Sequence, residues 1–321
     1  MVEIDITQIA GITIGQAENV TGGTGCTVIL CEEGATAGVD VRGGAPASRE
    51  TELLKPLNTV EVVHAVVLSG GSAYGLDAAA GVMAYLEEKG VGFDMQVAVV
   101  PIVCGASLFD LQIGDAKCRP DKAMGYAACC NAGEPLRQGN VGAGTGATVG
   151  KLFGPERMMK SGLGAYAIQV GDLQVGAIVA VNAMGDVRDV TTGALLAGLL
   201  NAEKTAVTST VEALCQQYAR PEELLGGNTT LGCIITNARL NKCQMNKVAS
   251  IAHNGFAKAI EPVHTSADGD TIFALATGKV PAQPDAVGVL AAETMARAIN
   301  QAVLHANSAY GLLAAKDLQS C

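Results

Sequence analysis

The stretch Gly226-Gly227-Asn228-Thr229-Thr230-Leu231 runs directly into Gly232-Cys233-Ile234-Ile235-Thr236. The glycines permit a turn of unusual backbone geometry, and the apolar, β-branched residues after them predict a buried strand. The Thr229 hydroxyl could attack the carbonyl group before it and move the acyl group from nitrogen to oxygen. Hydrolysis would then leave an α-amine, with a pKa near ~8, as general base for the same hydroxyl. On these residues alone, a tight turn entering a strand is the simpler interpretation.

The composition predicts a layered α/β protein. The chain has 321 residues, of which 49% are hydrophobic but only 3% aromatic, and it contains 40 glycines and no tryptophan. A core of alanine, valine and leucine favours closely packed helices and sheets over a few large aromatic anchors. The net charge of −10, without a basic tract, argues against nucleic acid or an anionic membrane surface as partner.

Cysteine usage and hydropathy bear on the compartment. The ten cysteines are scattered and form no Cys-x-x-Cys pair, so we interpret them as reduced core residues. None of the four histidines lies at metal-ligand spacing from another histidine or a cysteine, so no metal or other cofactor is expected. The longest apolar run, 97–104, contains Pro101 and is too short to span a membrane. With no basic N-terminal region, we expect a cytoplasmic protein.

Hydrophobic periodicity predicts strands and helices mixed in hairpins and crossovers, which indicates an α/β sandwich in one domain. Ser72 is a candidate helix N-cap, and Gly90 a candidate helix stop. A hairpin is expected to turn at Gly171-Asp172. The predicted strands are 26–30, 37–41, 62–68, 97–103, 165–170, 174–182, 229–237 and 271–276. The predicted helices are 73–89, 121–131, 207–219, 243–260 and 286–306.

The glycine-rich segment 142–151 does not match the nucleotide-binding motifs well. A P-loop reading of Gly150-Lys151 places Thr145 at the first glycine, and Leu152 replaces the hydroxyl residue that would hold magnesium. A dinucleotide-binding reading fails because Ala147 replaces the third glycine and a hairpin follows. Nucleotide binding nevertheless stays open, since glycine spacing specifies function only loosely.

Seven segments follow one another along nearly the whole chain: 40–46 with 49–51, 68–77, 101–103 with 108–111, 142–151, 181–187, 227–231 and 268–271. Taken in this order, they resemble one family, the self-cleaving DmpA aminopeptidases, β-peptidyl aminopeptidases and nylon-oligomer hydrolases. The segment Gly227 to Leu231 resembles the self-cleavage junction of that family. Each motif is weak by itself, whereas the ordered set is specific.

The resemblance implies roles for individual residues. Thr229 would be the nucleophile, unmasked when the Asn228–Thr229 bond is cut. Asn182 would donate to the oxyanion, and Lys151 would favour the neutral form of the new α-amine. Asp268 and Asp270 would orient the threonine, and at i, i+2 in an extended segment they would share one face. Taken alone, each of these residues also fits a turn or a solvated surface position.

The chain departs from some relatives at Phe109, where they carry a tyrosine whose hydroxyl assists at the oxyanion or substrate. Phe109 cannot donate a hydrogen bond. Either Asn182 and a backbone N–H suffice, or another group such as Tyr74 supplies the hydroxyl. Tyr74 and Phe109 are therefore candidate pocket residues.

The resemblance implies a four-layer α-β-β-α sandwich of the DmpA and ornithine acetyltransferase type, resembling N-terminal nucleophile hydrolases. We expect one domain, 1–321, that cuts itself into an α fragment (1–228) and a β fragment (229–321). It would hydrolyse small peptides or aminoacyl amides without a cofactor, as a homotetramer of αβ units. The alternatives are an acyltransferase of the ornithine acetyltransferase type and a non-catalytic ligand-binding protein.

Overall fold

The computed structural model describes residues 1–218 and 227–318, and ten of its strands form a hydrogen-bonded network that makes two sheets. The long strand β3 (Thr24–Val41) belongs to both sheets, because residues 24–30 and residues 36–41 pair with different strands. Its C-terminal half extends the first sheet, in the order β1 (Val2–Ile4), β11 (Leu163–Val170), β12 (Leu173–Ala180), β17 (Leu231–Arg239), β19 (Thr271–Pro281) and β3. Its N-terminal half joins the second sheet, with β2 (Thr13–Asn19), β5 (Val63–Ser69), β8 (Val103–Ser107) and β4 (Ser48–Arg49).

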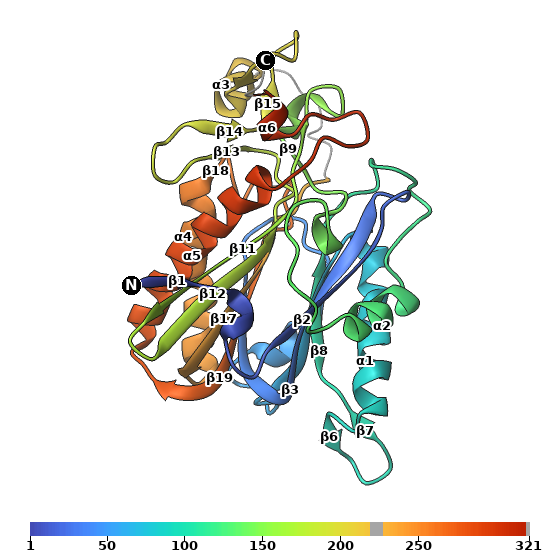
Figure 1. Cartoon of the computed structure of the whole chain (residues 1–321), viewed down its shortest axis with the longest axis vertical. Coiled ribbons are helices and arrows are strands. Elements are labelled where there is room, and N and C mark those ends of the chain that lie inside the picture. The colour runs from blue at the N-terminus through green and yellow to red at the C-terminus, as the bar shows by residue number, and fades with distance from the viewer. Residues whose placement is uncertain (219–226, 319–321) are drawn as a thin grey trace.

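The two sheets stack face to face between two pairs of helices (Figure 1). One pair, α4 (Lys242–Ala259) and α5 (Pro284–Leu304), packs on the first sheet through residues such as Phe256 and Met295. The other pair, α1 (Ala78–Glu88) and α2 (Lys122–Cys130), covers the second sheet. Side chains of both sheets, among them Leu68 and Phe273, fill the layer between them. The predicted four-layer α-β-β-α sandwich is therefore confirmed.

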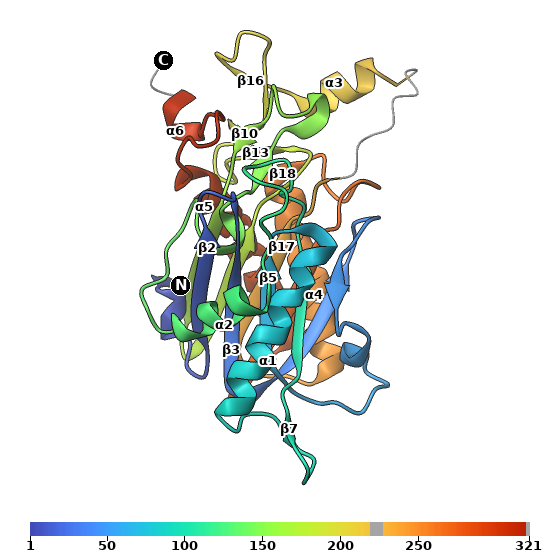
Figure 2. The same ribbon diagram turned by 90° about the vertical axis from the view of Figure 1, so that its right-hand side faces the viewer.

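The remaining elements are short, and those from β9 to α3 together with α6 gather at one end of the sandwich (Figure 2). The short strands are β6 (Phe93–Asp94), β7 (Val99–Val100), β9 (Thr148–Val149), β10 (Met159–Lys160), β13 (Asp186–Arg188), β14 (Leu195–Ala197), β15 (Leu199–Leu200), β16 (Val207–Thr208) and β18 (Ile260–Glu261). The short helices are α3 (Thr210–Gln216), α6 (Ala315–Leu318) and five 3₁₀ segments at Ile6–Gln8, Glu52–Leu54, Ser72–Asp77, Gly142–Gly144 and Lys151–Phe153.

Several expected elements need correction. The strands predicted at 26–30 and 37–41 are one strand, β3. The segment 97–103 is not one strand, because Pro101 lies between β7 and β8. Within 207–219, a two-residue strand precedes the short helix α3, and Ala219 lies outside the described residues.

The start of the helix predicted at 73–89 is also different. Ser72 has a φ of 56° and follows Gly71 at 81°, so both residues are left-handed and Ser72 does not cap the helix. A 3₁₀ segment, Ser72–Asp77, comes first, and α1 begins only at Ala78. The predicted stop at Gly90 is correct: this glycine has a φ of 69° and its N–H bonds to Glu87 O.

Among the described residues, nine cysteines are free and five of them are buried, namely Cys26, Cys31, Cys104, Cys129 and Cys233. The core interpretation holds for these five, whereas Cys130, Cys215 and Cys243 are exposed. None of the helices within 1–218 and 227–318 combines a membrane-spanning length with sufficient hydropathy.

Candidate active site

Thr229 lies just before β17, a strand in the middle of the first sheet, and is 3% exposed. Its backbone N–H donates to the carbonyl oxygen of Asn182 at 2.7 Å, and its hydroxyl donates to the carbonyl oxygen of Asn228. The peptide between Thr230 and Leu231 is held as well, because Thr271 N donates to Thr230 O at 3.1 Å, where β19 begins beside β17. The hydroxyl of Thr229 is thus fixed against the peptide group that precedes it.

Asn182 follows β12 and is fully buried next to Thr229. Its Oδ1 accepts from Lys151 Nζ at 2.5 Å and from Thr148 N at 3.1 Å. Its Nδ2 donates to the Phe109 carbonyl oxygen at 2.9 Å. The side chain therefore joins the glycine-rich segment to the loop after β8, and its own carbonyl holds Thr229.

Lys151 reaches the same place from the end of the glycine-rich segment. Its Nζ donates to Gly227 O at 2.9 Å, one residue before Asn228. Burial lowers the pKa of this amine to about 7, although the carboxylates of Asp268 and Asp110 act in the opposite direction. Gly150 has a φ of 72°, and a Cβ there would lie 2.0 Å from Gly198 C, so only glycine fits before this lysine.

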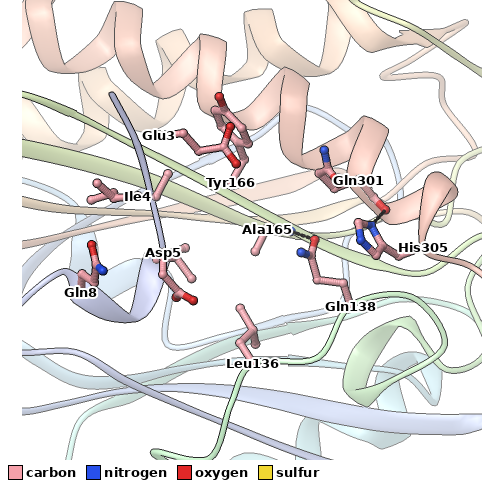
Figure 3. Close-up of a pocket in the computed structure, with 12 residues that line it drawn as sticks. Glu3, Ile4, Asp5, Gln8, Leu136, Gln138, Ala165, Tyr166, Gln301 and His305 are labelled. Carbon is pink, nitrogen blue, oxygen red and sulfur yellow. Dashed lines mark hydrogen bonds between the residues drawn. The ribbon is translucent and has the colours of Figure 1, made fainter. Parts of the chain in front are cut away.

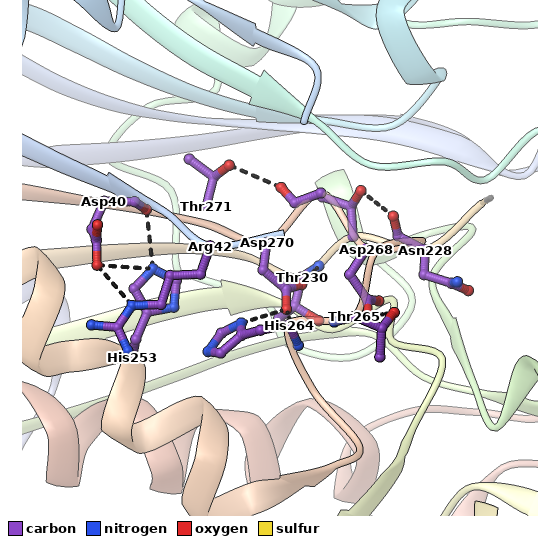
Figure 4. Close-up of polar contacts among 12 residues, drawn as sticks. Asp40, Arg42, Asn228, Thr230, His253, His264, Thr265, Asp268, Asp270 and Thr271 are labelled. Carbon is purple, nitrogen blue, oxygen red and sulfur yellow. Dashed lines mark hydrogen bonds and ion pairs between the residues drawn. The ribbon is translucent and has the colours of Figure 1, made fainter. Parts of the chain in front are cut away.

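The two aspartates are both buried but bind different groups (Figure 4). Asp268 Oδ2 accepts from Thr265 N at 3.0 Å and Thr265 Oγ1 at 2.5 Å, whereas Asp270 Oδ1 accepts from Thr230 N at 2.8 Å. Burial, with the neighbouring charge of Asp270, raises the pKa of Asp268 to about 6. The aspartates therefore shape the turn and the strand start around Thr229 and are not a matched pair on its hydroxyl.

The loop after β3, which contains Gly43 and Gly44, packs along the segment 265–270 that carries the two aspartates. Arg42 N donates to Asp270 O at 3.0 Å, and Ala45 N donates to Asp268 O at 2.8 Å. Gly269, between the aspartates, packs against both this loop and the nucleophile candidate. A methyl group at position 269 would lie 2.5 Å from Thr229 Oγ1 and 2.7 Å from Ala45 O.

Gly269→Ala should therefore slow catalysis by displacing the hydroxyl oxygen of Thr229. The added methyl group must displace the Thr229 hydroxyl or the loop, and misplacement of a reacting group by about 1 Å costs on the order of 10²-fold in rate. We expect self-cleavage and substrate turnover to fall by about that factor, measured by timed electrophoresis and steady-state kinetics. Unchanged rates would show that the site tolerates this shift.

The candidate pocket residues are separated in the structure. The ring of Phe109 lies beside Gly227, since a Cβ there would be 3.1 Å from Phe109 Cδ1. Tyr74 is 60% exposed, and its ring stacks on the Arg119 guanidinium, 3.7 Å from the ring centroid. Of the two residues, only Phe109 is thus placed among the described groups around Thr229.

Lys160 is a functional candidate that the sequence analysis did not identify. It is fully buried on β10, and in its protonated form its Nζ donates to three carbonyl oxygens: Gly144 at 3.1 Å, Ala147 at 2.8 Å and Ser161 at 2.5 Å. These bonds fold the segment that presents Thr148 and Lys151 to Asn182. The only sequence signal was a single charge after Met158-Met159, which is also common on surfaces.

Burial lowers the pKa of Lys160 to about 7, from about 10.4 in an unfolded chain. Between pH 7 and pH 10.4, Lys160 is protonated in the unfolded chain but neutral in the folded one. The free energy of unfolding therefore rises with pH, by up to about 1.4 kcal/mol per pH unit. In an uncleavable Thr229→Ala background, Lys160→Met should remove this contribution. Urea unfolding at pH 7.5, 8.5 and 9.5 measures it. An equal pH slope with and without Lys160→Met would contradict the assignment.

A separate cavity of 650 Å³ opens beside β1 and the end of α5 (Figure 3). Glu3, Asp5, Tyr166 and His305 are among its polar lining residues, whereas Thr229 and its partners are not. Within the described residues, no three histidine, cysteine or acidic side chains are grouped as metal ligands.

The sequence is similar to known proteins over most of its length. The model of peptidase family S58 matches residues 5–316. An aminopeptidase of Mycobacterium tuberculosis, described as uncharacterized, is 39% identical over 98% of this chain and 97% of its own length. The 6-aminohexanoate-oligomer endohydrolase of Kocuria sp. is 33% identical over 91% of this chain and 84% of its own length.

Solved structures show the same fold at lower identity. A Burkholderia sp. beta-aminopeptidase has a TM-score of 0.70 at 19% identity, covering 98% of this chain and 92% of that one. The L-aminopeptidase D-Ala-esterase/amidase of Ochrobactrum anthropi, described as a variant of the Ntn hydrolase fold, has a TM-score of 0.69 at 17% identity, covering 94% and 86%. With the family match over nearly the whole sequence, the chain belongs to peptidase family S58.

Proposed function

We propose that this protein is a self-processing hydrolase whose nucleophile is Thr229, cut between Asn228 and Thr229. The observation that carries the proposal is the contact of the Thr229 hydroxyl with the carbonyl group of Asn228, inside a buried site. Lys151 and Asn182 approach the same junction from two other elements. Asn228, Thr229, Lys151 and Asn182 thus place a nucleophile, an amine and an amide around one peptide bond.

In the first step, the Thr229 oxygen attacks the Asn228 carbonyl carbon, and its proton passes to a base. The C–N bond breaks, the nitrogen takes up a proton as the new α-amine, and an ester joins Asn228 to the threonine oxygen. Water then hydrolyses this ester and releases the Asn228 carboxylate. We assign the base to Lys151: a neutral amine has two hydrogens, for Gly227 O and Asn182 Oδ1, and keeps a lone pair for the proton.

After cleavage, the α-amine of Thr229 takes over as general base for its own hydroxyl. The Asn182 carbonyl, which already accepts from this nitrogen at 2.7 Å, would hold the amine in place. The Asn182 amide carries a second hydrogen besides the one bonded to Phe109 O, and we assign it to the oxyanion. One such donor lowers the barrier to acyl transfer by roughly 3–4 kcal/mol.

The proposed substrates are small amides with an aminoacyl group. Support comes from the relatives, which are named aminopeptidases and 6-aminohexanoate-oligomer hydrolases. The substrate would form an acyl ester with Thr229 and lose its amine, and water would release the acid. We further propose, from the family resemblance, that the mature αβ units assemble as homotetramers, which light scattering of the purified protein would test.

Timed denaturing electrophoresis, with assays of aminoacyl anilides and aminohexanoate amides, tests the proposal. Conversion of the full-length band into fragments 1–228 and 229–321, followed by hydrolysis without an added amine acceptor, is expected. Turnover only with an amine acceptor would instead indicate acyl transfer. A chain that stays intact and hydrolyses none of these amides would contradict the proposal.

A further inference from the structure

His264 has an unusual backbone and a direct bond to one of the site carboxylates. Its φ of 58° is in the left-handed region, which non-glycine residues adopt uncommonly, asparagine, aspartate and histidine more often than the others. In this conformation both its backbone N and its ring Nδ1 approach Asp270 Oδ2, at 3.1 and 2.8 Å. Because a carboxylate oxygen only accepts, Nδ1 is the protonated nitrogen of the ring.

The bond continues from Asp270 to the nucleophile. The other carboxylate oxygen of Asp270 accepts from Thr230 N at 2.8 Å, and Thr230 follows Thr229 directly. Asp270 is 1% exposed, so water does not compete for either oxygen. The orientation of this carboxylate therefore determines where the first peptide group after Thr229 lies.

Two neighbouring rings pack against His264 and hold its ring in the orientation that bonds to Asp270. The ring stands edge-on to His253, with centroids 4.7 Å apart, and stacks on Phe256 at 5.9 Å. His253 is itself fully buried and bonded through Nε2 to Asp40 O at 3.0 Å. The Nε2 of His264 is buried without a hydrogen-bond partner among the described residues. The bond to Asp270 is therefore the polar contact that accounts for a histidine in this place.

We propose that His264 is a positioning residue: it orients Asp270, which in turn holds the Thr230 amide and so aligns Thr229. The effect on rate rests on the proposed function, whereas the contact with Asp270 does not. His264 touches neither the hydroxyl nor the cleaved bond. Removing it should therefore lower kcat and the rate of self-cleavage, with little change in KM.

Two substitutions separate the hydrogen bond from the backbone conformation. Glycine and asparagine both accept a positive φ, but only asparagine places an N–H where Nδ1 lies. We expect His264→Gly to slow self-cleavage and kcat by about 10- to 100-fold, the loss that follows in metal sites when a residue orienting a metal ligand is removed. His264→Asn should recover most of this loss, although it also lacks the ring that packs on Phe256. Equal losses in both variants would overturn the proposal.

The Asp270→Asn background tests whether the effect passes through Asp270. There His264→Gly should slow the reaction by less than about threefold, because the carboxylate that it positions is already gone. A full 10- to 100-fold loss in that background would also overturn the proposal. The same four combinations of residues 264 and 270, placed in the uncleavable Thr229→Ala background, should show coupling between His264 and Asp270 in a urea-unfolding cycle. Coupling in this background, with no cleavage of the wild-type chain, would count against the proposed function alone, and absence of coupling would count against the positioning contact.

Discussion

Thr229→Ala is expected to leave the chain uncut and to abolish turnover while the fold persists. The substitution removes the oxygen that would attack Asn228 and later carry the acyl group, so no other group can form the ester. Loss of a nucleophile costs on the order of 10⁶-fold in a comparable hydrolase, so no activity above background should remain. The measurements are timed electrophoresis and amide hydrolysis, with circular dichroism for the fold. Activity of the variant would show that the nucleophile is assigned to the wrong residue.

The neighbouring residue provides a matched control. Thr230 is the same residue type and is also buried, but its hydroxyl has no hydrogen-bond partner among the described residues. Thr230→Val keeps the shape and removes only that hydroxyl, and the backbone N–H that bonds to Asp270 stays. This variant should cleave and turn over normally. Loss of activity in both variants would point to disturbed packing and not to a missing nucleophile.

Lys151→Met should lower self-cleavage by about 10²- to 10⁴-fold, the range that general bases contribute. Methionine occupies a similar volume, but its thioether cannot act as a base and cannot donate hydrogen bonds to Gly227 O and Asn182 Oδ1. Lys151→Arg should not rescue the rate, because a guanidinium stays charged and cannot accept the proton. Kinetics of fragment formation measure the effect. Lys117→Met, at an exposed lysine, is the control and should change nothing.

The pH dependence follows from the lowered pKa of Lys151, about 7. Its neutral form predominates above pH 7, so self-cleavage should accelerate as the pH rises from 6 to 8 and then level off. The residual reaction of Lys151→Met should lack this rise. A wild-type rate that falls across the same interval would contradict a neutral lysine as base.

Elements with a complete local signal could be predicted from the sequence. The hairpin turns at Gly171, whose φ of 59° needs glycine, and β11 and β12 flank it as expected. The helix expected at 243–260 is α4, which starts in a capping box between Asn241 and Gln244. The strand after the junction is β17, although it begins at Leu231, two residues later than expected.

Features that depend on distant contacts were not visible in the sequence. The strand β3 continues through a glycine-containing stretch because β2, β5 and β19 pair with different parts of it. Ser72 is left-handed because the preceding turn is held by Asp110 Oδ1, which accepts from Gly71 N at 2.7 Å. Neither the strand pairing of β3 nor the bond to Asp110 produces a hydrophobic pattern in the neighbouring sequence from which it could be predicted.

In the candidate site, too, some features could be predicted from the sequence and others depend on distant contacts. Thr229, Lys151 and Asn182 were expected to lie together. In the structure Asn182 bonds directly to both Thr229 and Lys151, and Lys151 also bonds to Gly227 on the other side of Asn228. The i, i+2 spacing of Asp268 and Asp270 predicted a shared face. Both carboxyl groups are buried and their charges interact, but Asp268 binds Thr265 and Asp270 binds the Thr230 amide. Lys160 and His264 were missed because their roles come from burial, which a single charged or aromatic residue in a sequence does not reveal.

The N-terminal sequence of the smaller fragment tests the central claim most directly. The purified protein would be incubated at pH 8, separated under denaturing conditions and examined by intact mass and stepwise degradation. A fragment that begins Thr229-Thr230-Leu231-Gly232-Cys233, absent from Thr229→Ala, is the predicted result. An intact chain, or a new terminus at any other residue, would contradict it.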